Sequence, residues 1–191
     1  MKKKIALLLA CALIVAGLSG CGIVKVVKIG QEGALTGETE FNSGAQSSED
    51  WGKVVTQITD SAKDLKDVQG KLGTEAVAVS GTAKIKEWNH KQEVKTYLVL
   101  DGYDSEVQVQ TGSVYIGTTI RDLQTLKAFS DFTNQTEWSE YAKALNKESD
   151  SLVVAPLKLS DDVAGKEITF VVAAVKKAGK IVVTLVSAEI K

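Results

Sequence analysis

Apolar residues recur at two different spacings along this chain, and each spacing predicts one kind of element. Between Trp51 and Leu65 they fall every three or four positions, which is typical of a helix with one buried face. A hydroxyl at Ser47 or Ser48 can cap this stretch, and two acids that suit the positive end of a helix follow it. The spacing therefore predicts a helix that begins near Ser47.

Beyond Gly73 the apolar residues alternate with polar or small ones, and this spacing of two is typical of strands. Short turns separate the first strands, which favours an antiparallel meander. A charged, glycine-containing turn at 176–180 separates the last two, which favours a hairpin. The predicted strands are 77–85, 94–100, 107–109, 114–116, 168–175 and 181–188.

A second helix is predicted near Thr136. Trp138, Tyr141 and Leu145 share one face of such a helix, and Asn146 offers a suitable end. Two helices and a larger number of strands predict an α+β fold that is mainly β.

The first 21 residues have the pattern of a secreted, lipid-modified protein. Residues 2–4 are lysines, and the apolar run 5–16 has the length of a secretory leader, shorter than the roughly 20 residues of a spanning helix. Leu-Ser-Gly at 18–20 precedes Cys21 in the pattern that lipoprotein processing requires. Cleavage before Cys21 and acylation of its thiol and amine are therefore predicted. An ordinary secreted protein with a structural Cys21 and an uncleaved anchor helix are the alternatives.

These patterns divide the chain into a signal peptide at 1–20, a lipid-anchored arm or linker at 21–46 and a single β-rich domain at 47–191. Glycines among Glu and Ser residues predict a loop over 30–46. The apolar residues 22–29 fit either a first strand or a partly ordered spacer. The predicted location is extracytoplasmic, lipid-anchored to a bacterial membrane, with the periplasm and the cell surface both open.

Cysteine content and charge narrow the classes of function. Cys11 leaves with the leader and Cys21 carries lipid, so the mature chain keeps no thiol for a disulfide, a metal site or a nucleophile. The chain has 23 Lys and Arg against 24 Asp and Glu, and cleavage removes three lysines, which leaves a net charge of −4. An acidic chain without a dense basic cluster argues against a nucleic-acid partner.

Catalytic residues are not evident in the sequence. His90 is the single histidine, and it lies in a predicted turn, where a solvated side chain is the ordinary outcome. Acid pairs such as Asp161 and Asp162 lie in polar segments and are typical of a surface. The sequence therefore predicts no enzymatic activity, no cofactor and no metal site.

Polar side chains gather between the strand predicted at 114–116 and the second helix. Their guanidinium, carboxylate and amide groups could hold the hydroxyl groups of a sugar: Arg121, Asp122, Asp131, Asn134 and Gln135. In the structural alternative, Arg121 pairs with a neighbouring aspartate, Thr133 or Asn134 caps the helix, and Phe129 and Phe132 pack beneath.

Three tryptophans offer aromatic faces that suit a sugar ring. Trp51 and Trp138 lie on the apolar stripes of predicted helices, so packing in the core is the better interpretation for both. Trp88 ends a predicted strand beside Asn89, and it fits either a cover for that end of the sheet or the mouth of a binding site. Trp88 is therefore the sixth candidate for ligand or partner binding.

Three blocks of sequence, together with the leader, resemble a known family: Ile-Gly-Thr-Thr-Ile-Arg-Asp at 116–122, Phe-Ser-Asp-Phe-Thr-Asn-Gln at 129–135 and Ala-Leu-Asn at 144–146. This family of predicted bacterial lipoproteins is catalogued as domain of unknown function 2291. The resemblance covers the chain from its leader, through Phe41 and the Trp51 helix, to these blocks, and beyond them only the strand pattern is similar. It implies a small closed barrel of the oligonucleotide/oligosaccharide-binding (OB) kind, often encoded beside sugar importers of the ATP-binding cassette class. Such a barrel does not fix function.

Two hypotheses from different classes follow. The first is a lipid-anchored, non-enzymatic accessory protein that binds a sugar or a component of an ATP-binding cassette sugar importer. The second is a structural or assembly lipoprotein that acts through protein–protein contacts with a transporter or envelope component and binds no small molecule.

Overall fold

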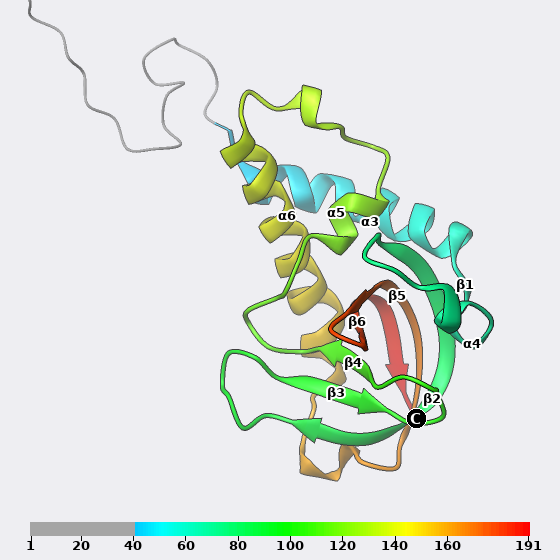
Figure 1. Cartoon of the computed structure of the whole chain (residues 1–191). Coiled ribbons are helices and arrows are strands. Elements are labelled where there is room, and N and C mark those ends of the chain that lie inside the picture. Colours follow the sequence, from blue (N-terminus) through cyan, green and yellow to red (C-terminus); the bar gives the residue numbers. More distant parts are fainter. Residues whose placement is uncertain (1–40) are drawn as a thin grey trace, which may run out of the picture. The chain divides into compact units, whose positions relative to one another are not determined.

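Five strands form a closed barrel in the computed structural model, which describes residues 41–191 (Figure 1). Their order around the barrel is β2-β3-β4-β6-β5, and β5 pairs back to β2. The strands are β2 (Val77–Asn89), β3 (Tyr97–Leu100), β4 (Val107–Gln110), β5 (Glu167–Lys177) and β6 (Lys180–Ile190). The prediction of an α+β, mainly β fold with an OB-like barrel is confirmed.

The barrel is mixed rather than purely antiparallel. The predicted meander holds for β2, β3 and β4, which pair antiparallel in sequence order. The hairpin of β5 and β6 then returns to the sheet, β5 pairs antiparallel with β2, and β6 lies parallel to β4. The parallel pair therefore arises from closure between segments that are far apart in the sequence.

Strand β2 closes the barrel because it takes part in two pairings. Residues 77–84 pair with β5, whereas Ile85 and residues 87–89 pair with β3, and the register shifts between Ile85 and Glu87. A bulge of this kind bends a strand and increases its twist. The predicted strand at 77–85 is therefore correct in place but continues to Asn89.

The interior of the barrel is filled by one side of each strand. Alternate positions are almost completely buried, as the period of two requires. The following residues have at most 4% of their surface exposed: Val79, Ile85, Leu98, Leu100, Val107, Val109, Ile168, Phe170, Val172, Ala174, Ile181, Val183 and Leu185. The other side of β3 and β4 therefore faces outwards.

Helix α3 (Ser43–Ser61) packs against helix α6 (Gln135–Ser149) beside the barrel (Figure 1). The helix begins before Ser47, within the predicted loop, because the Asn42 side chain accepts a hydrogen bond from the Ala45 amide at 2.9 Å and caps it. Ser47 is buried instead, and Ser48 donates to Glu148 of α6 at 2.5 Å. The rest of the predicted arm, residues 21–40, lies outside the described part of the chain.

Helix α6 confirms the second predicted helix but continues past Asn146. The Asn146 side chain is buried and donates to the Gly117 carbonyl at 3.1 Å, so it fixes the preceding loop rather than ending the helix. Tyr141 donates to Asp50 of α3 at 3.0 Å. Trp51 is 8% exposed, as its position on the apolar stripe predicted.

Short elements connect these parts. Strand β1 (Lys63–Asp64) pairs parallel with β2, and the remaining connections are α4 (Leu65–Val68), η2 (Gln69–Lys71), α5 (Thr119–Leu123), η3 (Phe129–Asp131), η4 (Asp150–Val154), η5 (Ala155–Leu157) and η6 (Asp161–Val163). The predicted hairpin is confirmed, with Ala178 and Gly179 both at positive φ, as a tight two-residue turn requires.

Candidate ligand-binding site

The outer face of β3 and β4 presents polar side chains in register. Tyr97 pairs with Gln110 and Val99 with Gln108, so these four residues lie on the side of the sheet opposite the barrel interior. Val182 of β6 lies beside Gln108 on the same face.

Two connecting segments extend this face beyond the strands. The Thr111 amide donates to the Thr96 carbonyl, and the Val114 amide donates to the Val94 carbonyl, each at 2.9 Å. These bonds hold residues 111–114 against residues 94–96. The strand predicted at 114–116 is wrong, because beyond this contact the chain turns away into a loop towards α5.

Gly112 makes this close approach feasible. A Cβ atom at this position would lie 2.6 Å from both the Thr96 nitrogen and the Val94 carbonyl oxygen. Backbone atoms cannot move aside as a flexible side chain could, so the contact requires glycine. The rim of the outer face is therefore fixed by backbone packing.

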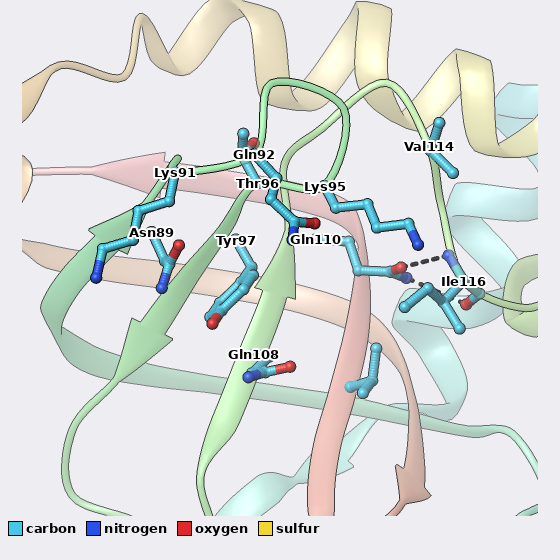
Figure 2. A pocket seen from close by; sticks show the side chains of 11 residues that line it. Asn89, Lys91, Gln92, Lys95, Thr96, Tyr97, Gln108, Gln110, Val114 and Ile116 are labelled. Atoms are coloured by element: carbon cyan, nitrogen blue, oxygen red, sulfur yellow. Dashed lines mark hydrogen bonds between the residues drawn. The ribbon is translucent and has the colours of Figure 1, made fainter.

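A pocket of about 340 Å³ lies on this face, and we call it the amide pocket (Figure 2). It lies between the strands and the two loops. Its lining residues are Asn89, Lys91, Gln92, Lys95, Thr96, Tyr97, Gln108, Gln110, Val114, Ile116 and Val182. Its volume falls at the small end of the roughly 300–1,000 Å³ that ligand pockets occupy.

Gln110 builds the wall of the amide pocket. Its amide nitrogen donates to Thr184 at 2.9 Å. Its amide oxygen accepts from the Ile116 backbone nitrogen at 2.5 Å (Figure 2). Gln110 is 7% exposed, so this pairing satisfies an otherwise costly buried amide. The loop that carries Ile116 is thereby tied to the barrel.

Other polar groups of the amide pocket are not used in this way. Within the described residues, the side chains of Asn89, Gln92 and Tyr97 make no hydrogen bond, and Gln108 makes one, to Glu106 at 2.6 Å. An amide carries both donors and acceptors. The pocket therefore offers several free hydrogen-bonding groups on a face fixed by Gln110 and Gly112.

A second hollow of about 280 Å³ adjoins the amide pocket, and the two share Ile116 and Val182. Asp122 lines this second hollow together with Thr118 and Thr119. Asp122, one of the sequence-predicted candidates, thus lines a hollow that adjoins the amide pocket.

Arg121 lies in α5, which the sequence did not predict. Two of its nitrogens donate to one oxygen of Asp122 at 2.7 and 2.9 Å, and a third contact reaches the Thr118 hydroxyl at 3.2 Å. The guanidinium also lies 4.5 Å from the centre of the Trp138 ring. The Trp138 ring in turn lies against that of Phe132, with ring centres 4.9 Å apart and planes tilted by 57°. We call these five residues the Arg121 cluster.

The remaining polar candidates lie at element ends. Asn134 caps α6, since its side-chain oxygen accepts from the Glu137 amide at 3.0 Å. Asp131 accepts from the Ala128 amide at 2.8 Å and closes the turn around η3. Gln135 is exposed, and its side chain makes no hydrogen bond within residues 41–191. The structure thus brings Arg121 and Asp122 together but does not bring Asp131, Asn134 and Gln135 to the amide pocket.

Trp88 supports the rim of the amide pocket from behind. Its indole nitrogen donates to the Thr111 hydroxyl at 3.3 Å, and Thr111 bonds Thr96 at 2.8 Å. The Trp88 ring lies 4.4 Å from that of His90. Trp88 does not line the pocket; it contacts Thr111, which in turn bonds the lining residue Thr96.

Sequence reasoning missed Gln108 and Gln110, although a signal was present. Both alternate with the buried Val107 and Val109, which marks them as outward polar positions on a half-buried strand. Asn89 and Gln92 carry no comparable signal, because only the fold brings their turn beside β4.

A third hollow lies beyond Val114 and contains a perturbed acid. Tyr115 donates to Asp150 at 3.4 Å, and both residues line this hollow. Burial raises the pKa of Asp150 above its usual range, and the hydrogen bond from Tyr115 opposes this rise.

Residues 41–191 contain no group of three or more His, Cys, Asp or Glu side chains placed to hold a metal ion. No helix among the described residues is long and apolar enough to span a membrane.

Comparison with protein families gives a match over residues 73–189, to the family described as "Predicted periplasmic lipoprotein (DUF2291)". The chain belongs to this family. It is therefore an extracytoplasmic, membrane-anchored protein. No curated protein matches the chain. Lipid attachment at Cys21 stays a prediction, because Cys21 lies outside both the matched and the described residues.

Comparison with solved structures supports the fold. The chain is similar to an OB-fold protein from Thermotoga maritima MSB8, with a TM-score of 0.60, 15% identity, and coverage of 80% of this chain and 100% of that one. At this identity the likeness shows the fold alone. An aspartyl tRNA synthetase from Entamoeba histolytica has a TM-score of 0.32 and 6% identity, covers 68% of this lipoprotein and 21% of the synthetase, and carries no weight.

Proposed function

We propose that this lipoprotein is a non-enzymatic accessory protein of a sugar importer of the ATP-binding cassette class and that it binds a small sugar in the amide pocket. The observation that carries this proposal is the set of free hydrogen-bonding groups there, on Asn89, Gln92 and Tyr97. Sugar hydroxyls donate and accept hydrogen bonds, and side-chain amides complement both roles. The Tyr97 ring adds an apolar surface for the carbon face of the sugar.

The shape of the site supports binding rather than transient surface contact. Gln110 and Gly112 hold the pocket walls through backbone contacts, so a ligand would meet a preformed site. Preformed sites lose less conformational entropy on binding.

A non-enzymatic role is supported by the chemistry of the lining. Its described residues provide amides, lysines, a threonine, a tyrosine and aliphatic side chains. They include no acid or histidine that could serve as a general base beside a hydroxyl nucleophile.

Isothermal titration calorimetry tests the proposal on the full chain. The chain is held in a polyoxyethylene detergent, whose headgroup carries neither a sugar nor a charge, and titrated with pentoses, hexoses, and their acids and phosphates. We expect a saturable heat with at least one compound, lost in the double variant Asn89→Ala/Tyr97→Ala. Gln135→Ala removes an exposed amide away from the pocket; it is the control and retains the heat. Absence of heat across the panel, or heat that persists in the double variant, would contradict the proposal.

A second candidate, a structural or assembly lipoprotein, is favoured by an exposed apolar loop. Leu126 and Phe129 are 38% and 51% exposed between α5 and α6. Exposed apolar groups on one connecting segment suit a protein partner. Crosslinking in the native membrane separates the two candidates. Capture of a permease that is lost in Phe129→Ser and kept in Asn89→Ala/Tyr97→Ala would favour the assembly role.

A further inference from the structure

We propose that the ligand of the amide pocket carries an anionic group, a carboxylate or a phosphate, which the ammonium groups of Lys91 and Lys95 hold. This inference rests on the proposed function and names the chemical class of its ligand. It makes the preferred ligand a sugar acid or a sugar phosphate rather than a neutral sugar.

The charge of the lining is the first observation. Lys91 and Lys95 both line the amide pocket, and no Asp or Glu belongs to its described lining. Glu93 lies in the same loop but is exposed and does not line the pocket. Neither lysine makes an ion pair with another described residue. Two positive charges therefore face a hollow without a counter-charge from these residues.

Other hollows on residues 41–191 differ in this respect. One contains Asp122, another Asp64 and a third Asp150, each with lysines nearby. A fourth is lined by acids from the β3–β4 turn and by Lys180, which pairs with Glu106 at 3.1 Å. Each of these hollows thus has at least one acid in its lining, whereas the lining of the amide pocket has lysines and no acid.

The two lysines reach the pocket from different sides. Figure 2 shows Lys95 extending towards Gln110 and Ile116, while Lys91 points to the side of Asn89. An anionic group between the amides and either lysine would meet a charge-assisted hydrogen bond, which is stronger than a neutral one. The free amides would hold the hydroxyl groups of the same molecule.

The size of the pocket and the overall charge favour a small anion over a large one. The mature chain predicted from the leader is acidic, so it repels extended polyanions at long range. The positive charge is confined to a hollow of about 340 Å³. A monosaccharide with one acidic group fits both facts.

Matched ligands on one scaffold test the inference. Glucose, glucuronate and glucose 6-phosphate, and the corresponding galactose series, are titrated into the full chain in the polyoxyethylene detergent. We expect at least one anion to bind about tenfold more tightly than its neutral parent, since two partly hydrated lysines each contribute modestly. Comparison of glucuronate with glucose 6-phosphate shows whether the pocket prefers a carboxylate or a phosphate.

Charge-matched variants then assign the effect to these lysines. In Lys91→Gln/Lys95→Gln the ratio of the anion's affinity to that of its neutral parent is expected to fall to near one. Lys53→Gln/Lys71→Gln removes two exposed lysines outside the pocket and is expected to keep the preference. If anion and neutral parent bind equally well to the native chain, the inference is wrong while the proposed function stands. If no sugar binds, both fail.

Discussion

The amide pocket and the Arg121 cluster are both rich in polar side chains, but they use them in opposite ways. In the cluster, Arg121 is engaged by Asp122, Thr118 and the face of Trp138. In the pocket, Asn89 and Gln92 make no side-chain hydrogen bond within the described residues. Polar side chains that are hydrogen-bonded within the fold stabilise it. Polar side chains without such bonds on a rigid face are available to a ligand. A polar segment in a sequence therefore indicates a site only when its internal partners are known.

The largest effect is expected where the rim of the amide pocket is built. Gly112→Ala would force a Cβ against two backbone atoms, and overpacking of this kind costs about 3 kcal/mol of unfolding free energy. Gly52→Ala in α3 is the control, since nothing lies within 4 Å of its Cβ, and it is expected to stabilise by about 0.5–1 kcal/mol. Urea unfolding followed by circular dichroism measures both. Equal stability of Gly112→Ala and the native chain would show that this rim is not rigid.

Removal of Arg121 tests whether its cluster is structural. Arg121→Ala loses the Asp122 contact and the packing on Trp138, which together contribute about 1–2 kcal/mol to stability. Sugar binding is expected to be unchanged, because Arg121 does not line the amide pocket. Calorimetry and urea unfolding on the same sample give both values. Loss of binding in a folded Arg121→Ala chain would instead favour the sequence-based expectation that Arg121 is a ligand group.

The first turn of α6, in the same polar segment, offers a test with a smaller expected loss of stability. Asn134→Ala removes the helix cap and is expected to cost about 1 kcal/mol. Gln135→Ala, one residue later and exposed, is expected to leave stability unchanged. The unfolding temperatures of the two variants, compared with that of the native chain, measure the difference. If both variants lose the same stability, the cap is not the cause.

The smallest expected effect is a pH dependence of the unfolding free energy that arises from Asp150. Burial raises the pKa of Asp150 above its usual 3.8, so the folded chain holds this proton more tightly than the unfolded chain. Stability from this group is fully present below pH 3.8 and is lost as pH rises through the higher pKa of the folded state. Asp150→Asn is therefore expected to gain stability relative to the native chain as pH rises from 3.8 to neutral. Urea unfolding at a series of pH values measures the difference, and a constant difference would contradict the raised pKa.

Local patterns in the sequence were sufficient for much of the fold. Spacings of three or four placed α3 and α6, and alternation with a charged turn placed the hairpin of β5 and β6, because each depends on residues close together in the chain. The parallel pairing of β4 with β6 could not be predicted in this way, since it depends on closure of the whole barrel. The alternation of Val114 and Ile116 suggested a strand, but the chain turns away after Val114.

The candidate site was harder to predict for a related reason. Asn89, Gln92 and Gln108 come from a strand end, a turn and another strand, and the registers of β2 against β3 and of β3 against β4 bring them together. Residues 116–135 offered a compact polar segment and so drew the prediction. Burial and hydrogen bonding, which distinguish a saturated cluster from an open pocket, are properties of the fold and not of the residue types.

Side-chain amide resonances test the central comparison most directly. In ¹H–¹⁵N spectra of the full chain titrated with the tightest-binding sugar of the panel, the amides of Asn89 and Gln92 are compared with those of Asn134 and Gln135. We expect saturable shifts for the first pair and none for the second, because only the first pair lines the amide pocket. Shifts confined to Asn134 and Gln135 would place the ligand beside the Arg121 cluster and contradict the account.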